Sequence, residues 1–116
     1  MIRCLVVDDE PLALHILEDY ISKMPFLQLL KATTNPIEAL QLVQEGNIDL
    51  IFLDIQMPKM GGIDVLRRIA GNRCRVILLT AHADEMYRKK CLELNVLGFY
   101  DKITEFHDFI EFVKLM

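Results

Sequence analysis

Two short apolar runs in this sequence each end at acidic residues. Residues 4–7 are followed by Asp8 and Asp9, and residues 50–53 are followed by Asp54. Continuous apolar runs of this length are typical of strands that are buried on both faces of a parallel sheet. In such sheets, ligands bind in a crevice beyond the carboxyl ends of the strands. If the two strands are neighbours, the three aspartates share one crevice, and a fold retains such a group of repelling charges when a cation binds among them.

The rest of the chain alternates between patterns typical of strands and of helices. Pro11 and Pro36 suit the first turn of a helix, where a residue without an N–H costs nothing, and Asn35 is a good N-cap. Apolar residues recur at helical spacing after both prolines, and we expect Ile16 and Ile37 to belong to the buried stripes. We expect strands over residues 2–7, 27–32, 48–53, 75–79 and 96–100, and helices over residues 11–24, 36–46, 63–70, 83–94 and from about 104 onwards.

Strict alternation of five strands with five helices predicts one α/β domain over residues 1–116. Right-handed crossovers between successive strands give a parallel sheet whose two faces are covered by helices. A doubly wound five-stranded sheet of the order 2-1-3-4-5 places the first and third strands side by side. That order brings together the strand ends that carry Asp8, Asp9 and Asp54.

Composition and charge exclude several classes of protein. The chain has 116 residues, of which 53% are hydrophobic and 26% are charged, so we expect a folded core and no long disordered segment. No apolar stretch approaches the roughly 18–20 residues of a membrane span, and the first residues begin a strand, not a signal peptide. Three cysteines without CxxC spacing indicate reduced thiols in the cytoplasm, and we expect Cys4 and Cys91 to be buried apolar residues. The net charge of −4 predicts no direct contact of this domain with nucleic acid.

The ends of the fourth and fifth strands add a hydroxyl group and an ammonium group to the predicted crevice. Thr80 follows the fourth apolar run, and Lys102 follows the fifth. The acids repel bare phosphate, and no glycine-rich loop is present to hold it, whereas Mg2+ prefers carboxylate oxygens, waters and phosphate oxygens. Once Mg2+ is bound, a phosphoryl group can enter, with Thr80 and Lys102 at its oxygens and Asp54 as a carboxylate nucleophile.

These residues together resemble the receiver domain of two-component response regulators, the CheY-like family. The resemblance covers essentially the whole chain, and the order of its motifs makes it specific. It implies the flavodoxin-like strand order given above. The motifs are Val7-Asp8-Asp9-Glu10, Phe52-Leu53-Asp54-Ile55-Gln56-Met57-Pro58 with Gly62, Leu79-Thr80-Ala81, and Lys102.

The resemblance implies a role for each acidic residue of the crevice. Asp54 accepts a phosphoryl group from a histidine kinase in a reaction that depends on Mg2+. Asp9 binds the metal directly, Asp8 binds it through water, and Asp54 and the backbone carbonyl of Gln56 complete the protein ligands. We expect no further reaction apart from slow self-dephosphorylation, so the chain is not predicted to be an enzyme.

The resemblance also implies how phosphorylation changes the surface. Thr80 and Lys102 hold the phosphoryl oxygens, and Phe99 matches the aromatic residue that changes rotamer when Thr80 moves. Phosphorylation then changes the face made by the fourth helix, the fifth strand and the fifth helix, and the domain forms a homodimer through that face. The switch controls an output domain outside this chain. Residues 8–13 are similar to receivers joined to LytTR-type DNA-binding domains, so transcription regulation is the expected output.

One departure from the family pattern leaves two other functions open. The family usually has a cis proline after its lysine, but Ile103 follows Lys102 here. A cis bond before Ile103 costs about 2.5–4 kcal/mol, so we expect a trans or strained peptide that places Lys102 differently. The first alternative function is a binding module that does not use phosphorylation. The second is a phosphatase with an aspartyl nucleophile, although such enzymes commonly have a second acid two residues later, where this chain has Gln56.

Overall fold

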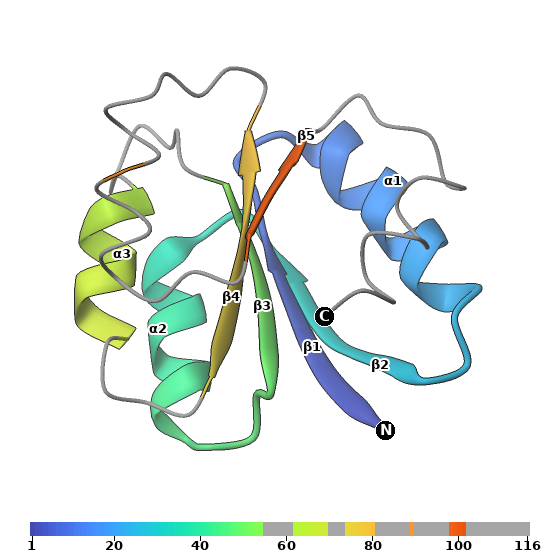
Figure 1. Cartoon of the computed structure of the whole chain (residues 1–116), viewed down its shortest axis with the longest axis horizontal. Coiled ribbons are helices and arrows are strands. Elements are labelled where there is room, and N and C mark those ends of the chain that lie inside the picture. Colours follow the sequence, from blue (N-terminus) through green and yellow to red (C-terminus); the bar gives the residue numbers. More distant parts are fainter. Residues whose placement is uncertain (55–61, 70–73, 81–88, 90–97, 102–116) are drawn as a thin grey trace.

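A parallel sheet of five strands runs through the centre of the molecule in the order β2-β1-β3-β4-β5 (Figure 1). The computed structural model describes residues 1–54, 62–69, 74–80, 89 and 98–101. The strands are β1 (Ile2–Val7), β2 (Leu27–Thr33), β3 (Leu50–Asp54), β4 (Arg75–Thr80) and β5 (Gly98–Asp101), and the helices are α1 (Pro11–Ser22), α2 (Pro36–Gln44) and α3 (Gly62–Ile69).

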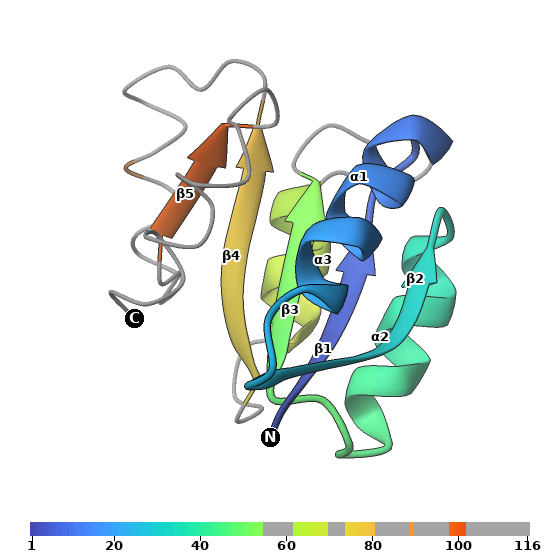
Figure 2. The same cartoon turned by 90° about the vertical axis from the view of Figure 1, so that its right-hand side faces the viewer.

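The strand order is the doubly wound order 2-1-3-4-5 that was predicted. Every strand pair is parallel, so each connection has to cross over the sheet. Helix α1 covers one face, and helices α2 and α3 cover the other (Figure 2). The fourth and fifth predicted helices lie outside the described residues, apart from the exposed Lys89 in the fourth. Among the helices of the described ranges, none is both long and apolar enough to cross a membrane.

Alternation along the strands divides the core into two layers. One set of strand side chains packs with α1, and the other set packs with α2 and α3. The α1 layer contains Cys4, Val6, Leu14, Leu17, Ile21, Leu50, Phe52, Ile77 and Leu79. The opposite layer contains Leu5, Val7, Ala39, Leu40, Val43, Ile51, Leu53, Val65, Leu66, Ile69, Val76 and Leu78. Strands buried on both faces explain why β1 and β3 appear in the sequence as continuous apolar runs.

Two residues assigned to buried helix stripes are exposed. Ile16 is 38% exposed and Ile37 is 54% exposed, so both predictions were wrong. The stripe of α1 that meets the sheet contains Leu14, Leu17 and Ile21, and Ile16 lies outside it. Apolar spacing alone allows more than one stripe on a short helix, and the packing of the helix on the sheet selects one of them.

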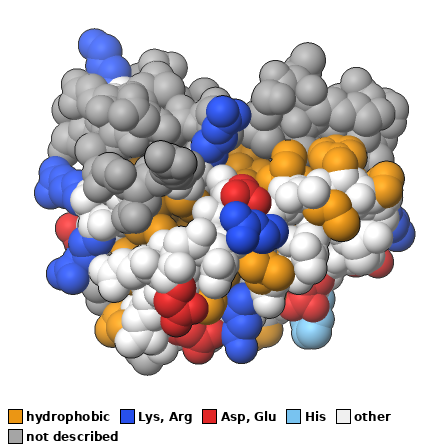
Figure 3. All heavy atoms as spheres, turned by 90° about the horizontal axis from the view of Figure 1, so that it is seen from below, with side chains coloured by type: hydrophobic (Ala, Val, Ile, Leu, Met, Phe, Trp, Pro, Cys, Tyr) orange, Lys and Arg blue, Asp and Glu red, His pale blue; other side chains and the backbone are white. Residues whose placement is uncertain are grey.

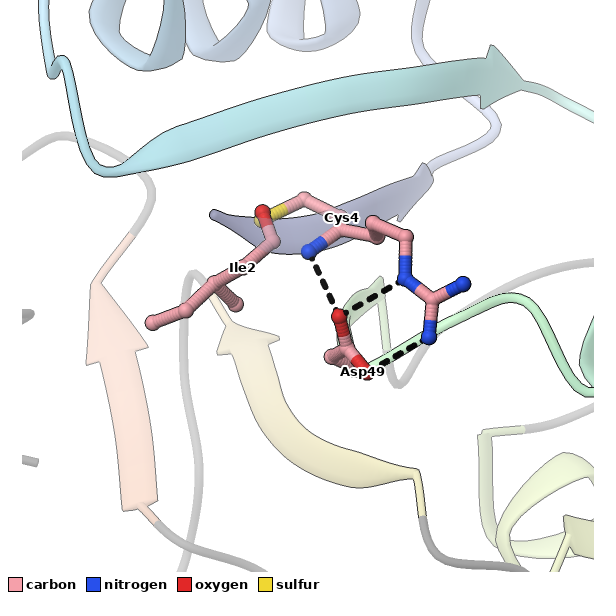
Figure 4. A network of polar contacts seen from close by, with 4 residues as sticks. Ile2, Cys4 and Asp49 are labelled. Carbon is pink, nitrogen blue, oxygen red and sulfur yellow. Dashed lines mark hydrogen bonds and ion pairs between the residues drawn. The ribbon is translucent and has the colours of Figure 1, made fainter.

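Asp49 has hydrogen bonds to the beginnings of both β1 and β4 at the amino-terminal end of the sheet. Figure 4 shows its contacts with the β1 segment. Its Oδ2 accepts hydrogen bonds from the backbone N of Arg3 (2.8 Å) and from Arg3 Nε (3.0 Å), and its Oδ1 accepts one from Arg3 Nη2 (3.1 Å). The backbone N of Asp49 donates to Arg3 O over 2.9 Å, and its carbonyl accepts from the backbone N of Arg75 over 3.0 Å. Asp49, the residue before β3, therefore connects the beginnings of β1 and β4 through hydrogen bonds.

We expect the Arg3–Asp49 ion pair to make stability depend on acid pH. The hydrogen bonds from Arg3 lower the pKa of Asp49 to about 2. A carboxyl group whose pKa is lower in the folded chain stabilises the fold above its unfolded pKa, and this contribution is lost as pH falls toward the folded value. Asp49→Asn should therefore unfold at lower urea concentration than the wild type at pH 7, with the difference shrinking between about pH 4 and pH 2. A difference that stays constant over this range would contradict the assignment.

The lower face of the molecule, where the strands begin, carries basic, acidic and apolar side chains close together (Figure 3). The buried Cys4 lies near this end, and burial raises the pKa of its thiol to about 12. Burial raises the pKa of the Cys74 thiol to about 12 as well. Cys4 is therefore a protonated core residue at neutral pH, as expected, while Cys91 lies outside the described residues.

Candidate functional site

The carboxyl ends of β1 and β3 lie next to each other, as the predicted crevice requires. These strands pair directly, with Val7 opposite Leu53, so the next residue of each strand is Asp8 and Asp54 respectively. Leu50 and Phe52 face the α1 layer, and the alternation of the strand directs Asp54 to the same side. Asp54 is 1% exposed. Two carboxylates from distant parts of the sequence therefore begin at neighbouring points on one edge of the sheet.

The turn after β1 brings three carboxylates together. Oxygen atoms of Asp8, Asp9 and Glu10 all lie within 4.8 Å of one another. Asp8 is fully buried, Asp9 is half-buried and Glu10 is exposed, so the group extends from the core to the surface. Carboxylate oxygens are donors that suit a hard cation such as Mg2+, which binds one or two carboxylates and retains several waters. Asp54, a predicted ligand, is not part of this group.

Neither of the two aspartates is the N-cap residue of α1. The N-cap residue of α1 is Glu10, and its side chain makes no capping hydrogen bond. Asp8 Oδ1 instead accepts from the backbone N of Glu10 over 3.0 Å, before the helix begins. The carboxylate of Glu10 joins the group, a role that the sequence analysis did not assign to it. The available signal was its place as the third of three consecutive acids.

The other predicted site residues are described only in part. Thr80 is the last residue of β4, one position beyond Leu79, which is opposite Asp54. Phe99 lies on β5 opposite Leu78, and Asp101, opposite Thr80, immediately precedes Lys102 in the sequence. The backbone thus places Thr80 beside the end of β3. Gln56, Lys102 and Ile103 lie outside the described residues.

Comparison with known families and curated proteins gives a consistent result. The response regulator receiver domain model matches residues 4–114. The virulence-factor transcription regulator BvgA from Bordetella pertussis is 29% identical over 114 residues, which cover 97% of this chain and 54% of BvgA. A protein-glutamate methylesterase/protein-glutamine glutaminase from Pyrococcus abyssi is 36% identical over 104 residues, which cover 87% of this chain and 28% of that protein. The chain spans about half of the first relative and under a third of the second.

Solved structures share the fold over nearly the whole chain. The complex of CheX and CheY with BeF3 and Mg2+ from Borrelia burgdorferi contains a chain that matches with a TM-score of 0.89 and 27% sequence identity. The match covers 98% of this chain and 87% of that one. The matched region therefore includes the strand ends that carry the acidic residues.

Proposed function

The chain belongs to the response regulator receiver domain family, whose members are phosphorylation-controlled switches of two-component signalling, and we propose that Asp54 is its phosphoryl acceptor. Receiver domains bind Mg2+ at an acidic pocket, and the oxygens gathered at Asp8, Asp9 and Glu10 fit that role. The observation that carries the proposal is the pairing of β1 with β3. It makes the buried Asp54 a neighbour of the turn that holds the other acids.

The proposed reaction transfers a phosphoryl group to a carboxylate. An oxygen of Asp54 forms a bond to phosphorus while the bond between phosphorus and the donor breaks, and the donor keeps the electron pair. The product is an acyl phosphate. Asp8, Asp9, Asp54 and the backbone carbonyl of Gln56 would hold the metal, which neutralises phosphoryl charge when bound. Thr80 donates to one phosphoryl oxygen and Lys102 neutralises another.

The signalling consequences form the second part of the proposal. Thr80 moves toward the phosphoryl group, Phe99 changes rotamer, and the face around β5 gains affinity for a partner. The donor is a histidine kinase in the cytoplasm, and dimerisation of the receiver conveys the signal to an output domain outside this chain. A LytTR-type DNA-binding domain is the output that the sequence favours. The chain itself has no catalytic role beyond its own phosphorylation and slow dephosphorylation.

Incubation with a small phosphodonor tests this function directly. Wild-type protein with acetyl phosphate and Mg2+ should gain the mass of one phosphoryl group per chain in intact mass spectrometry. Omission of Mg2+ should reduce the adduct strongly, because Asp54 lies beside other acids that repel the donor. Absence of an adduct with the metal present would overturn the proposal and favour a binding module independent of phosphorylation.

We also expect Mg2+ to stabilise the fold. A ligand that binds only the folded chain adds RT ln(1 + [L]/Kd), which is about 1.4 kcal/mol at ten times Kd, equivalent to a Tm rise of several degrees. The Asp9→Ala variant should show a smaller rise because it lacks a carboxylate ligand. Glu45→Ala removes the same charge from an exposed position at the end of α2 and should retain the full rise. A wild-type melting curve that does not respond to millimolar Mg2+ would count against the metal site.

A further inference from the structure

The turns after β1 and β2 have the same construction. In each, a backbone N–H donates to a side-chain oxygen two residues earlier in the sequence. The N–H of Glu10 donates to Asp8 Oδ1 and the N–H of Asn35 donates to Thr33 Oγ1, both over 3.0 Å. Glu10 and Asn35 are also the N-cap residues of α1 and α2. Such local bonds determine the direction in which the chain leaves a strand.

A backbone hydrogen bond connects these two turns. The N–H of Asp8 donates to the carbonyl oxygen of Thr33 over 3.2 Å, just beyond the last pair of the two strands, Val7 and Thr33. Thr33 therefore holds the main chain of Asp8 with its carbonyl and the amide of Asn35 with its hydroxyl. The Thr33 residue is only 7% exposed, and a buried hydroxyl group is normally kept for its hydrogen bonds.

The turn after β2 is itself attached to a firmly packed helix. Asn35 Oδ1 accepts from the N–H of Ile37 over 3.0 Å and so caps α2. Ala39, Leu40 and Val43 bury the inner face of that helix against the sheet. Thr33 thus connects the main chain of Asp8 to an element whose position the core determines.

We propose that Thr33 is a positioning residue for Asp8 in metal binding, an inference that rests on the proposed function. The hydroxyl restrains the turn, and the restrained carbonyl holds Asp8 so that its carboxylate stays beside those of Asp9 and Glu10. Without the hydroxyl, the turn gains freedom and Asp8 must be ordered when the cation binds. The expected consequence is weaker Mg2+ binding with little change in phosphorylation once the site is saturated.

Titration of the whole chain with Mg2+ alone tests the proposal. Thr33→Val keeps the size of the side chain but removes the hydroxyl, and its Kd should rise by about threefold to tenfold. Thr33→Ser retains the hydroxyl, and Thr34→Val makes the same change at the adjacent, exposed threonine. Both should bind within about twofold of the wild type. At saturating Mg2+, phosphoryl uptake by Thr33→Val should reach the wild-type level.

Amide hydrogen exchange in the metal-free protein separates positioning from general loss of stability. In Thr33→Val, the amides of Asp8 and Asn35 should exchange faster while the amide of the buried Phe52 keeps its wild-type rate. Equal acceleration at Phe52, or a Kd equal to that of Thr34→Val, would overturn the role of Thr33. Failure of the wild type to bind Mg2+ would instead overturn the proposed function. If Thr33→Val does not fold, Thr33→Ala removes the same hydroxyl and carries the same expectation.

Discussion

Asp54→Asn should give a folded protein that forms no phosphoryl adduct. Asparagine has nearly the same shape as aspartate, but its amide cannot act as the carboxylate nucleophile. The substitution also removes one negative charge from a buried position beside other acids. Repulsion among the acids therefore decreases, and the metal-free fold should not be destabilised. Intact mass spectrometry after incubation with acetyl phosphate and Mg2+ measures the result. We expect no detectable adduct under conditions in which wild-type protein is mostly modified.

The matched control is the same substitution at the other end of β3. Asp49→Asn replaces the aspartate that precedes the strand, whereas Asp54→Asn replaces the one that ends it. Asp49→Asn should lose stability because it loses the charged partner of Arg3, yet it should accept a phosphoryl group as the wild type does. An undiminished adduct on Asp54→Asn, located by peptide mapping to Asp8 or Asp9, would show that a different carboxylate is the acceptor.

Phe52→Ala should cause the largest loss of stability among the single substitutions considered. Phe52 is fully buried in the α1 layer, between β1 and β4 at the centre of the sheet. Truncation of such a residue removes apolar contacts and leaves a cavity that the sheet cannot fill, at a cost of about 3–5 kcal/mol. A domain with a total stability of about 5–15 kcal/mol would lose a large part of it. Urea unfolding followed by circular dichroism measures the difference.

An exposed residue of similar chemistry provides the comparison for Phe52. Leu12 is 71% exposed on α1, so Leu12→Ala should change the free energy of unfolding by no more than about 0.5 kcal/mol. A similar decrease in the free energy of unfolding for Phe52→Ala and Leu12→Ala would mean that Phe52 is not a core residue. At temperatures where Phe52→Ala stays folded, it should still accept a phosphoryl group, because the substitution leaves Asp54 and the acidic turn intact.

Local patterns were sufficient for much of the architecture. The apolar runs at β1 and β3 and the proline at the start of α1 and α2 predicted these elements to within a few residues of their observed bounds. Their alternation predicted a parallel sheet, since successive parallel strands require crossovers, and the strand order followed from the doubly wound fold type and the family resemblance. The same patterns misplaced Ile16 and Ile37, because spacing along a helix does not identify which of several stripes meets the sheet.

For the site, the sequence alone determined which chemical groups stand at the strand ends: aspartates after β1 and at the end of β3, and a threonine at the end of β4. The tertiary structure decided which of these groups lie close together and which are buried. It placed Val7 opposite Leu53 and buried Asp8 and Asp54. It also brought Glu10 into the acidic group and formed the backbone hydrogen bond between Asp8 and Thr33. The reason is physical: strand pairing and burial depend on contacts between segments far apart in the chain, whereas residue type and local spacing do not.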